Sequence, residues 1–553
     1  MQLINWLKNR VTHFSFMGVL IGSLFFALSL TPSLIPRDFL FQGILAGLCF
    51  ALGYGSGVFI RWVWQFLELP PPKPKLLGFL RRLTVVLVAI ILIYCLWHSV
   101  AWQNSIRELM DMPPLVSSNA IIVGLIGLSL AFILILISQY IYELTSYANK
   151  KLQKYLPRRV VLIVGPLFIA IFLINIFNGV IAKSVLHILD ASFQKTDKLF
   201  ADGQTAPTEN LASGSAQSIV KWADLGRLGR KFVISGPTQA QISAFTTQPA
   251  QQPLRIYVGL NSAATAQQRA ELALQEMLRV DAFSRKILVI ANPTGTGWVD
   301  PMSVNTLEYM HAGDTAIVSM QYSYLASWLS LLAEPEVSAQ SAKALFNVVY
   351  KHWTNLPKNA RPKLYLNGLS LGSHGSELSA NLITMLSDPI NGALWAGPPF
   401  ANSIWRSLTD TRDAGSPAWL PKIGDSSIVR FTSETNALQI AGAKWGEMRI
   451  VYVQHASDGI VFFDMEAAFK QPDWMIGERG PDVSPELRWY PIVTFVQLLL
   501  DMATAIIPPL GYGHTYGPNG YIDAWAEVTA PEGWDEADSD SLKAIFANEI
   551  KRE

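Results

Sequence analysis

Residues 363–386 read KLYLNGLSLGSHGSELSANLITML, and this stretch is the most informative one for the fold class. The alternation over 363–367 is typical of a β-strand, and apolar residues after Gly372 recur at helical spacing. Between them stands Gly-Leu-Ser-Leu-Gly, centred on Ser370. Strand, Gly-x-Ser-x-Gly and helix together predict a nucleophile elbow, a tight turn that exposes the serine hydroxyl at a helix N-terminus. The alternative interpretation is an ordinary Gly/Ser turn of an α/β protein without a catalytic role.

The composition indicates a chain that is partly embedded in a membrane. Its 553 residues are 50% hydrophobic and only 15% charged, which is too long for one ordinary domain and too apolar for a wholly soluble protein. The net charge of +1 does not indicate a nucleic-acid partner. Cys49 and Cys95 both lie in the apolar N-terminal third. The rest of the chain therefore has neither a disulfide framework nor a thiolate metal site.

Apolar stretches in the first third predict five membrane spans, each of which needs about 20 residues. The first lacks a small-residue cleavage site and is followed at once by another span, so we interpret it as retained rather than as a signal peptide. No span has a charged residue near its centre, which favours anchoring over ion transport. The expected spans are 14–34, 39–60, 83–100, 119–140 and 160–182.

The charges of the connecting loops predict the orientation of these spans. Basic residues precede the first span and fill the second and fourth loops, whereas the loops between carry little net charge. Positive loops stay in the cytoplasm. With five spans, the N-terminus is expected to be cytoplasmic and the C-terminal part periplasmic or otherwise extracytoplasmic, at the inner membrane of a bacterium. A different number of spans would reverse this orientation.

The remaining chain predicts an α/β domain. We expect a transmembrane domain over 1–188, a linker or edge segment over 189–253 and a catalytic domain over 254–553, in which short Val/Ile runs alternate with amphipathic helices. That alternation is typical of a mostly parallel sheet with helices on both faces. The predicted strands are 255–260, 286–291, 316–321, 363–367, 392–396, 427–432 and 448–454, and the predicted helices are 264–280, 301–311, 337–353 and 373–386.

Residues for a catalytic triad follow the elbow in the expected order. A serine becomes a nucleophile when a base takes its proton and an acid orients that base. In this kind of fold the order along the chain is Ser, then Asp or Glu, then His. Asp458 lies just past a predicted strand, and His514 lies in a glycine-flanked loop. We therefore expect Ser370, Asp458 and His514 to act together.

Other polar residues compete for these roles. Glu434, which follows the strand at 427–432, is the alternative acid. His455 stands beside Asp458 and is expected to line the pocket or bond a backbone group. His374 follows Ser370 by four residues in the next helix, from which it reaches the serine hydroxyl poorly.

An oxyanion hole needs two N–H groups aimed at the developing negative charge. Leu371, directly after the nucleophile, is expected to supply one. The loop NPTGTGW at 292–298 follows an earlier predicted strand and is expected to supply the other, from Thr294 or Gly295. A phosphate-binding loop is excluded because no Gly-Lys-Ser/Thr follows.

Several segments carry a family resemblance over essentially the whole chain. GLSLGSHGSE, NPTGTGWVDP, GDTAIVSMQYSYLASW, LWAGPPFANSIW and VYVQHASDG together resemble the bacterial membrane-anchored α/β-hydrolase family. Its members join a multi-span N-terminal region to a C-terminal α/β-hydrolase domain. The resemblance implies a serine hydrolase triad but names no substrate.

Aromatic residues beside the expected site predict the kind of substrate. Together with the membrane anchor, they favour an acyl or lipid ester, so we expect an extracytoplasmic esterase or lipase that needs no metal or organic cofactor. An acyltransferase with the same triad, and a non-catalytic membrane binding or transport protein with a hydrolase-like module, remain alternatives. The expected partners are the lipid bilayer and an acyl-ester substrate, and the expected pocket residues are Trp298, Tyr322, Tyr324, Phe400 and His455.

Overall fold

The chain forms two compact units, which are described separately. The computed structural model describes residues 14–551 except 71–73, 118, 156, 158–159, 162–196 apart from 167 and 171, 198, 200–203, 326, 328, 331–334 and 381–384. One unit comprises Met1–Lys183 and Phe463–Pro509, and the other comprises Ser184–Phe462 and Leu510–Glu553. The predicted domain over 254–553 is therefore interrupted, because its residues 463–509 belong to the N-terminal unit.

A parallel sheet forms the centre of the second unit. In the described part of this unit, seven strands lie in the order β1-β3-β2-β4-β5-β7-β6, and every neighbouring pair is parallel. Their residues are buried almost without interruption, as in a sheet covered on both faces. All seven predicted strands are thus confirmed, as β1 Leu254–Val258, β2 Ile287–Asn292, β3 Thr315–Met320, β4 Lys363–Leu369, β5 Gly392–Ala396, β6 Val429–Thr432 and β7 Arg449–Val453.

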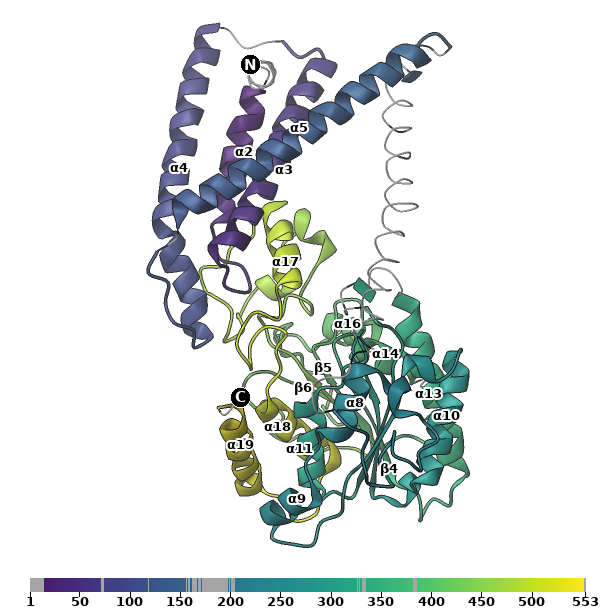
Figure 1. Cartoon of the computed structure of the whole chain (residues 1–553). Coiled ribbons are helices and arrows are strands. Elements are labelled where there is room, and N and C mark those ends of the chain that lie inside the picture. Colours follow the sequence, from purple (N-terminus) through teal and green to yellow (C-terminus); the bar gives the residue numbers. More distant parts are fainter. Residues whose placement is uncertain are drawn as a thin grey trace. The chain divides into compact units, whose positions relative to one another are not determined.

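Helices cover the two faces of this sheet (Figure 1). On one side α13 (Pro335–Asn355) packs against both α10 (Ala266–Arg279) and α14 (Leu371–Ser379). On the other, α11 (Pro301–Met310) packs against α18 (Pro518–Thr529), which contacts β5, β7 and α19 (Glu536–Ile550). The predicted helix at 373–386 is described as far as Ser379 in α14, and its residues 381–384 lie outside the described part. The short α16 (Ser403–Asp410) follows β5.

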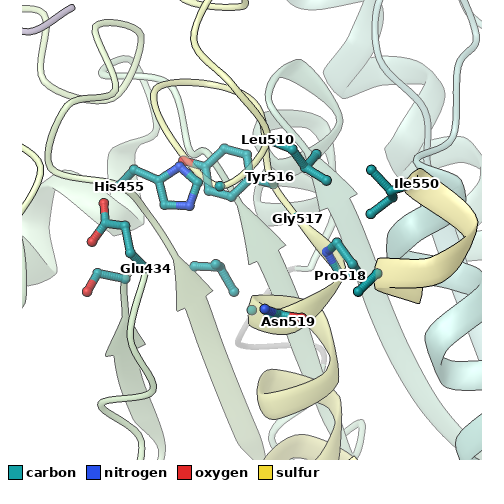
Figure 2. Close-up of a pocket in the computed structure, with 13 residues that line it drawn as sticks. Glu434, His455, Leu510, Tyr516, Gly517, Pro518, Asn519 and Ile550 are labelled. Carbon is teal, nitrogen blue, oxygen red and sulfur yellow. The ribbon is translucent and has the colours of Figure 1, made fainter. Parts of the chain in front are cut away.

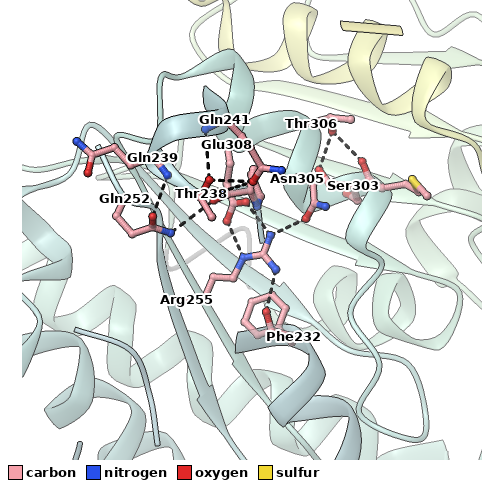
Figure 3. A network of polar contacts seen from close by, with 12 residues as sticks. Phe232, Thr238, Gln239, Gln241, Gln252, Arg255, Ser303, Asn305, Thr306 and Glu308 are labelled. Atoms are coloured by element: carbon pink, nitrogen blue, oxygen red, sulfur yellow. Dashed lines mark hydrogen bonds and ion pairs between the residues drawn. The ribbon is translucent and has the colours of Figure 1, made fainter. Parts of the chain in front are cut away.

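The segment expected to be a linker or edge is folded into the second unit throughout its described part, and Ser218 Oγ and the Ile219 N–H bond Glu276 of α10 over 2.7 and 3.1 Å. It forms α8 (Gly226–Ile234) and α9 (Gln239–Thr246). Arg255 of β1 bonds the Phe232 carbonyl over 2.8 Å and pairs with Glu308 of α11 through Nε–Oε1 and Nη2–Oε2 contacts of 2.8 and 2.6 Å (Figure 3). Because both charged side chains are buried, losing either partner would leave an uncompensated charge. The ion pair thus joins β1 to α11, and the bond to the Phe232 carbonyl joins α8 to the same edge strand.

The N-terminal unit contains long apolar helices. Three described helices are long and apolar enough to cross a membrane, namely α3 (Phe39–Phe66), α4 (Pro74–Leu109) and α5 (Ala120–Leu152). The expected first span, 14–34, is instead the 14-residue α2 (Phe16–Ser29). At about 1.5 Å per residue it measures roughly 21 Å, short of a hydrocarbon core of about 30 Å. The helix stops there because Pro32 disfavours helical backbone at the residue before it. The expected fifth span, 160–182, lies almost wholly outside the described residues.

Small residues and the 463–509 segment complete the packing of this unit. A Cβ on Gly47 would lie 2.7 Å from the Gly127 carbonyl, and one on Gly57 would lie 2.5 Å from the Met17 carbonyl, so the glycines of α3 allow close helix packing. Helix α17 (Val493–Ala503) adds Val493 and Val496 to a core cluster formed with Leu45 and Cys49 of α3.

Candidate active site

Ser370 occupies a strained turn between β4 and α14. Its backbone has φ +54° and ψ −127°, which costs a non-glycine residue of order 1–3 kcal/mol and is typical of a functional site. A Cβ on Gly368 would lie 2.4 Å from the Gly372 carbonyl carbon, and one on Gly372 would lie 2.3 Å from the Asn292 carbonyl oxygen. Both glycines are therefore required by close backbone contacts. The turn has the geometry that the sequence predicts for a nucleophile elbow.

Asp458 and His514 form a buried pair. The loop after β7 supplies Asp458, and the loop before α18 supplies His514. Nδ1 of His514 lies 2.7 Å from Oδ2 of Asp458. Asp458 is fully buried and His514 is 8% exposed. The imidazole is thus held through Nδ1, and its Nε2 has no hydrogen-bond partner among the described residues.

Gly397 links this pair to the elbow. The Ser370 N–H donates to the Ala396 carbonyl over 3.0 Å. The next residue, Gly397, has φ +50°, and a Cβ there would lie 2.7 Å from Cε1 of His514. Ala396 thus bonds the elbow, and its neighbour contacts the imidazole, so the loop after β5 lies between Ser370 and His514. No hydrogen bond joins Ser370 Oγ to Nε2 of His514 among the described residues.

Tyr516 is a member of this site that the sequence analysis missed. Its hydroxyl donates to Oδ2 of Asp458 over 2.7 Å. The ring of His455 stacks on the Tyr516 ring, with centroids 4.3 Å apart, and Nδ1 of His455 lies 2.8 Å from the Gly513 carbonyl. The short segment GHTYG gives only one signal of this role, a tyrosine two residues after the histidine.

The surroundings of Asp458 keep it ionised. Burial alone would raise the pKa of Asp458, but the His514 contact and the hydrogen bonds from Tyr516 and the Ile460 N–H outweigh burial and lower that pKa below its usual value. Burial raises the pKa of Tyr516, so its phenol stays protonated and remains a donor. An ionised carboxylate with this set of donors can fix one tautomer of His514, with the proton on Nδ1.

Glu434 and His455 line a separate cavity of about 170 Å³ beside Tyr516 (Figure 2). Neither Ser370 nor His514 lines it. The structure therefore places His455 behind Tyr516 and bonded to backbone, and it pairs His514 with Asp458 rather than with Glu434. His374 is likewise directed elsewhere, with Nδ1 2.9 Å from Oδ1 of Asn402.

The predicted oxyanion donors differ in availability. The N–H of Leu371 makes no hydrogen bond within the described chain. In contrast, the Thr294 N–H donates to the Trp298 carbonyl over 2.8 Å, and the Gly295 N–H donates to Ser327 Oγ over 3.1 Å. Both are already engaged, so in this structure neither is open to a substrate.

Asn292 offers a donor that the sequence analysis overlooked. It ends β2 in register with Gly368 of β4, and its carbonyl touches the elbow at Gly372. The side chain is 6% exposed, and Nδ2 has no hydrogen-bond partner in the described part of the chain. A buried amide without a partner is costly, which makes this group a candidate for contact with a bound substrate.

The predicted pocket residues have different surroundings. Tyr322 is buried just past β3, and burial raises the pKa of its phenol, which therefore stays protonated. Tyr324 is engaged with Asn261, whose Oδ1 accepts from its hydroxyl over 2.8 Å. Trp298 and Phe400 are half-buried, which leaves part of each ring accessible.

No group of three His, Cys, Asp or Glu side chains with metal-ligand geometry occurs among the described residues.

A parallel sheet with a serine elbow after its central strand, followed by a paired aspartate and histidine, defines an α/β-hydrolase-like protein. Comparison with known families agrees, because residues 254–542 match the model of the alpha/beta-hydrolase family and residues 30–237 match the model of that family's N-terminus. The chain therefore belongs to this alpha/beta-hydrolase family. No curated protein and no solved structure matches it significantly.

Proposed function

We propose that this protein is a membrane-anchored serine hydrolase that cleaves a carboxylic ester through an acyl-enzyme. The observation that carries the proposal is the 2.7 Å contact between Nδ1 of His514 and Asp458, with the imidazole held against Gly397 beside the Ser370 elbow. Nε2 of His514 has no hydrogen-bond partner among the described residues and can therefore accept a proton.

The proposed reaction uses Ser370 as nucleophile. Nε2 of His514 takes the hydroxyl proton as Oγ attacks the acyl carbonyl, and the imidazolium then protonates the departing alcohol. Water, deprotonated by the same histidine, hydrolyses the acyl-enzyme and restores the serine. Asp458 holds the imidazole tautomer and stabilises its charged form.

We assign the oxyanion contacts to the Leu371 N–H and the Asn292 side-chain amide. The first follows the nucleophile directly, and the second comes from the neighbouring strand β2. Both are donors without partners in the described chain. Asn292 takes the place of Thr294 and Gly295 because their N–H groups already bond Trp298 and Ser327.

The substrate class and the location are also part of the proposal. Three long apolar helices support membrane anchoring. The alternating basic loops favour an inner-membrane topology, and the catalytic unit lies outside the cytoplasm when residues 160–182 cross the membrane as the sequence predicts. Aromatic side chains such as Trp298 and Phe400 support an acyl or lipid ester as substrate. An acyltransferase would use the same first half-reaction and replace water by another acceptor.

A fluorophosphonate probe tests the proposal. The purified wild type should be labelled, and Ser370→Ala should not. Ser407→Ala, which removes an exposed serine from α16, should be labelled like the wild type. A folded wild type that resists the probe would favour a non-catalytic binding module. Esters of graded acyl length then test the substrate class, and a preference for short, charged acyl groups would contradict a lipid substrate.

A further inference from the structure

Arg37 is a buried cation whose hydrogen bonding is incomplete. It lies in the connection between α2 and α3 and is only 3% exposed. Its Nη2 donates to the Thr31 carbonyl over 2.6 Å, but Nε and Nη1 have no partner among the described residues. A buried guanidinium needs its donors satisfied, so these two nitrogens point to a missing acceptor.

Two neighbouring amides are incomplete in the same way. Oε1 of Gln103 accepts from the Arg37 N–H over 2.8 Å, and its Nε2 has no partner among the described residues. Nε2 of Gln42 donates to the Ser29 carbonyl over 3.2 Å, and its Oε1 likewise has no partner in the described part of the chain. Both glutamines are buried. The unmatched groups are thus mostly donors, with one acceptor among them.

These residues line one cavity of about 80 Å³ in the N-terminal unit. Four further polar residues line it, namely Asp38, Ser99, Ser117 and Asn119, and the remaining lining is apolar. Since each water takes about 30 Å³ of liquid, the space suits a charged group of a few heavy atoms rather than a whole lipid. The apolar lining residues are Leu30, Phe39, Leu96, Val100, Leu115 and Val123.

The acidic residues near this segment accept no hydrogen bond from the guanidinium of Arg37. Asp501 of α17 accepts from Ser33 Oγ over 2.8 Å and from the Leu34 N–H over 3.0 Å. Asp38 accepts from the N–H groups of Leu40 and Phe41 at the start of α3. Asp501 and Arg37 attract each other electrostatically, but no ion-pair contact within 4 Å joins Arg37 to a carboxylate in the described part of the chain. Nε and Nη1 of Arg37 therefore remain open to an acceptor there.

We propose that this cavity binds a phosphate oxyanion, held by Arg37 and the Gln103 amide, with the Gln42 oxygen accepting from a hydroxyl of the same ligand. Guanidinium matches phosphate in charge and in the geometry of its donors. The mixed lining suits the phosphate of a lipid headgroup, and free phosphate shares the same chemistry. The site is independent of the proposed hydrolase function.

Binding to the full-length protein in detergent tests this site. Phosphatidylglycerol, diacylglycerol with the same chains, and inorganic phosphate are each added to delipidated protein, and the shift in melting temperature and the lipid retained in native mass spectra are measured. Phosphatidylglycerol should stabilise the wild type and diacylglycerol should not. Stabilisation by inorganic phosphate as strong as that by the lipid would identify the source as free anion.

Substitutions of Arg37 test whether its guanidinium holds the phosphate. Arg37→Met should weaken phosphatidylglycerol binding roughly ten- to a hundredfold, the loss expected for hydrogen bonds to a charged group, and Arg37→Lys should recover part of it. Arg107→Met, in the same unit but away from the cavity, should bind like the wild type. Equal binding by Arg37→Met would overturn the proposal. If Arg37→Met does not fold, the melting temperature of the wild type tests the proposal instead. If neither phosphatidylglycerol nor inorganic phosphate raises it, the cavity holds only water and the proposal is wrong.

Discussion

Tyr516 donates its hydroxyl hydrogen to Oδ2 of Asp458, the carboxylate oxygen that also contacts Nδ1 of His514. Two donors, each 2.7 Å away, therefore share one oxygen of a fully buried carboxylate. The Ile460 N–H occupies the other oxygen over 2.8 Å. This network fixes the orientation of Asp458 and tunes its basicity toward the imidazole.

Tyr516→Phe should lower kcat roughly tenfold, in line with the loss of a hydrogen bond to a charged group, and leave KM nearly unchanged. With one donor fewer, Asp458 is more basic and stabilises the imidazolium more strongly, so the acid limb of kcat/KM should move to higher pH. Tyr521→Phe is the matched control, because that buried phenol also bonds a carboxylate, Oδ2 of Asp300, over 2.8 Å. Identical pH profiles for both variants would show that Tyr516 does not act on His514.

Asp458→Asn should lower kcat by about 10⁴-fold, the loss seen when a triad aspartate becomes an amide that favours the wrong tautomer. Glu434→Gln should change kcat by less than about threefold, because Glu434 lines a cavity that excludes His514. Steady-state kinetics with one acyl ester measures both. A larger loss of kcat in Glu434→Gln than in Asp458→Asn would show that Glu434, and not Asp458, orients the histidine.

Asn292→Ala should lower kcat by about 10²–10³-fold, the cost of removing one oxyanion donor. Substrate binding should change little, because the contact strengthens as charge develops on the carbonyl oxygen. Asn292→Asp keeps the shape but loses the amide donor, so it should be at least as impaired. If both variants keep wild-type kcat, the second donor must lie elsewhere in the loop.

Gly397→Ala should abolish most activity while leaving the protein folded. Its Cβ would lie 2.7 Å from Cε1 of His514 at a φ of +50°, so the imidazole must move. Gly424→Ala carries the same backbone cost, of order 1 kcal/mol, because its φ is +53°, yet its Cβ would meet nothing within 4 Å. Both variants should therefore remain folded in a melting-temperature measurement, but only Gly397→Ala should lose activity.

Much of the second unit could be predicted because its signals are local. Each strand is a short and largely buried run in which apolar residues are frequent, and such runs stand out between polar turns. The order of Ser370, Asp458 and His514 along the chain predicted the juxtaposition of Asp458 and His514. Tyr516 was missed because a phenol that reaches an aspartate 58 positions away leaves no periodic signal.

The interruption at 463–509 could not be predicted from the sequence for a related reason. The run at 493–503, VTFVQLLLDMA, fits any apolar helix, and only tertiary packing assigns Val493 and Val496 to the cluster around Leu45. In the chain, this excursion separates Asp458 from His514. The length of the first helix was also misjudged, because apolar residues continue to Leu34 after the helix itself has ended at Ser29.

Asp300→Asn should change how stability depends on pH. Burial raises the pKa of Asp300 to about 6 from 3.8, although the Tyr521 hydroxyl and the Met302 N–H oppose the shift. A raised carboxyl pKa stabilises the fold below the unfolded value, and this contribution is lost as pH rises through about 6. Asparagine does not titrate, so between pH 4 and pH 7.5 the variant should gain about 2 kcal/mol relative to the wild type. Melting temperatures of both proteins in detergent across this range measure the effect, and parallel curves would show that Asp300 titrates normally.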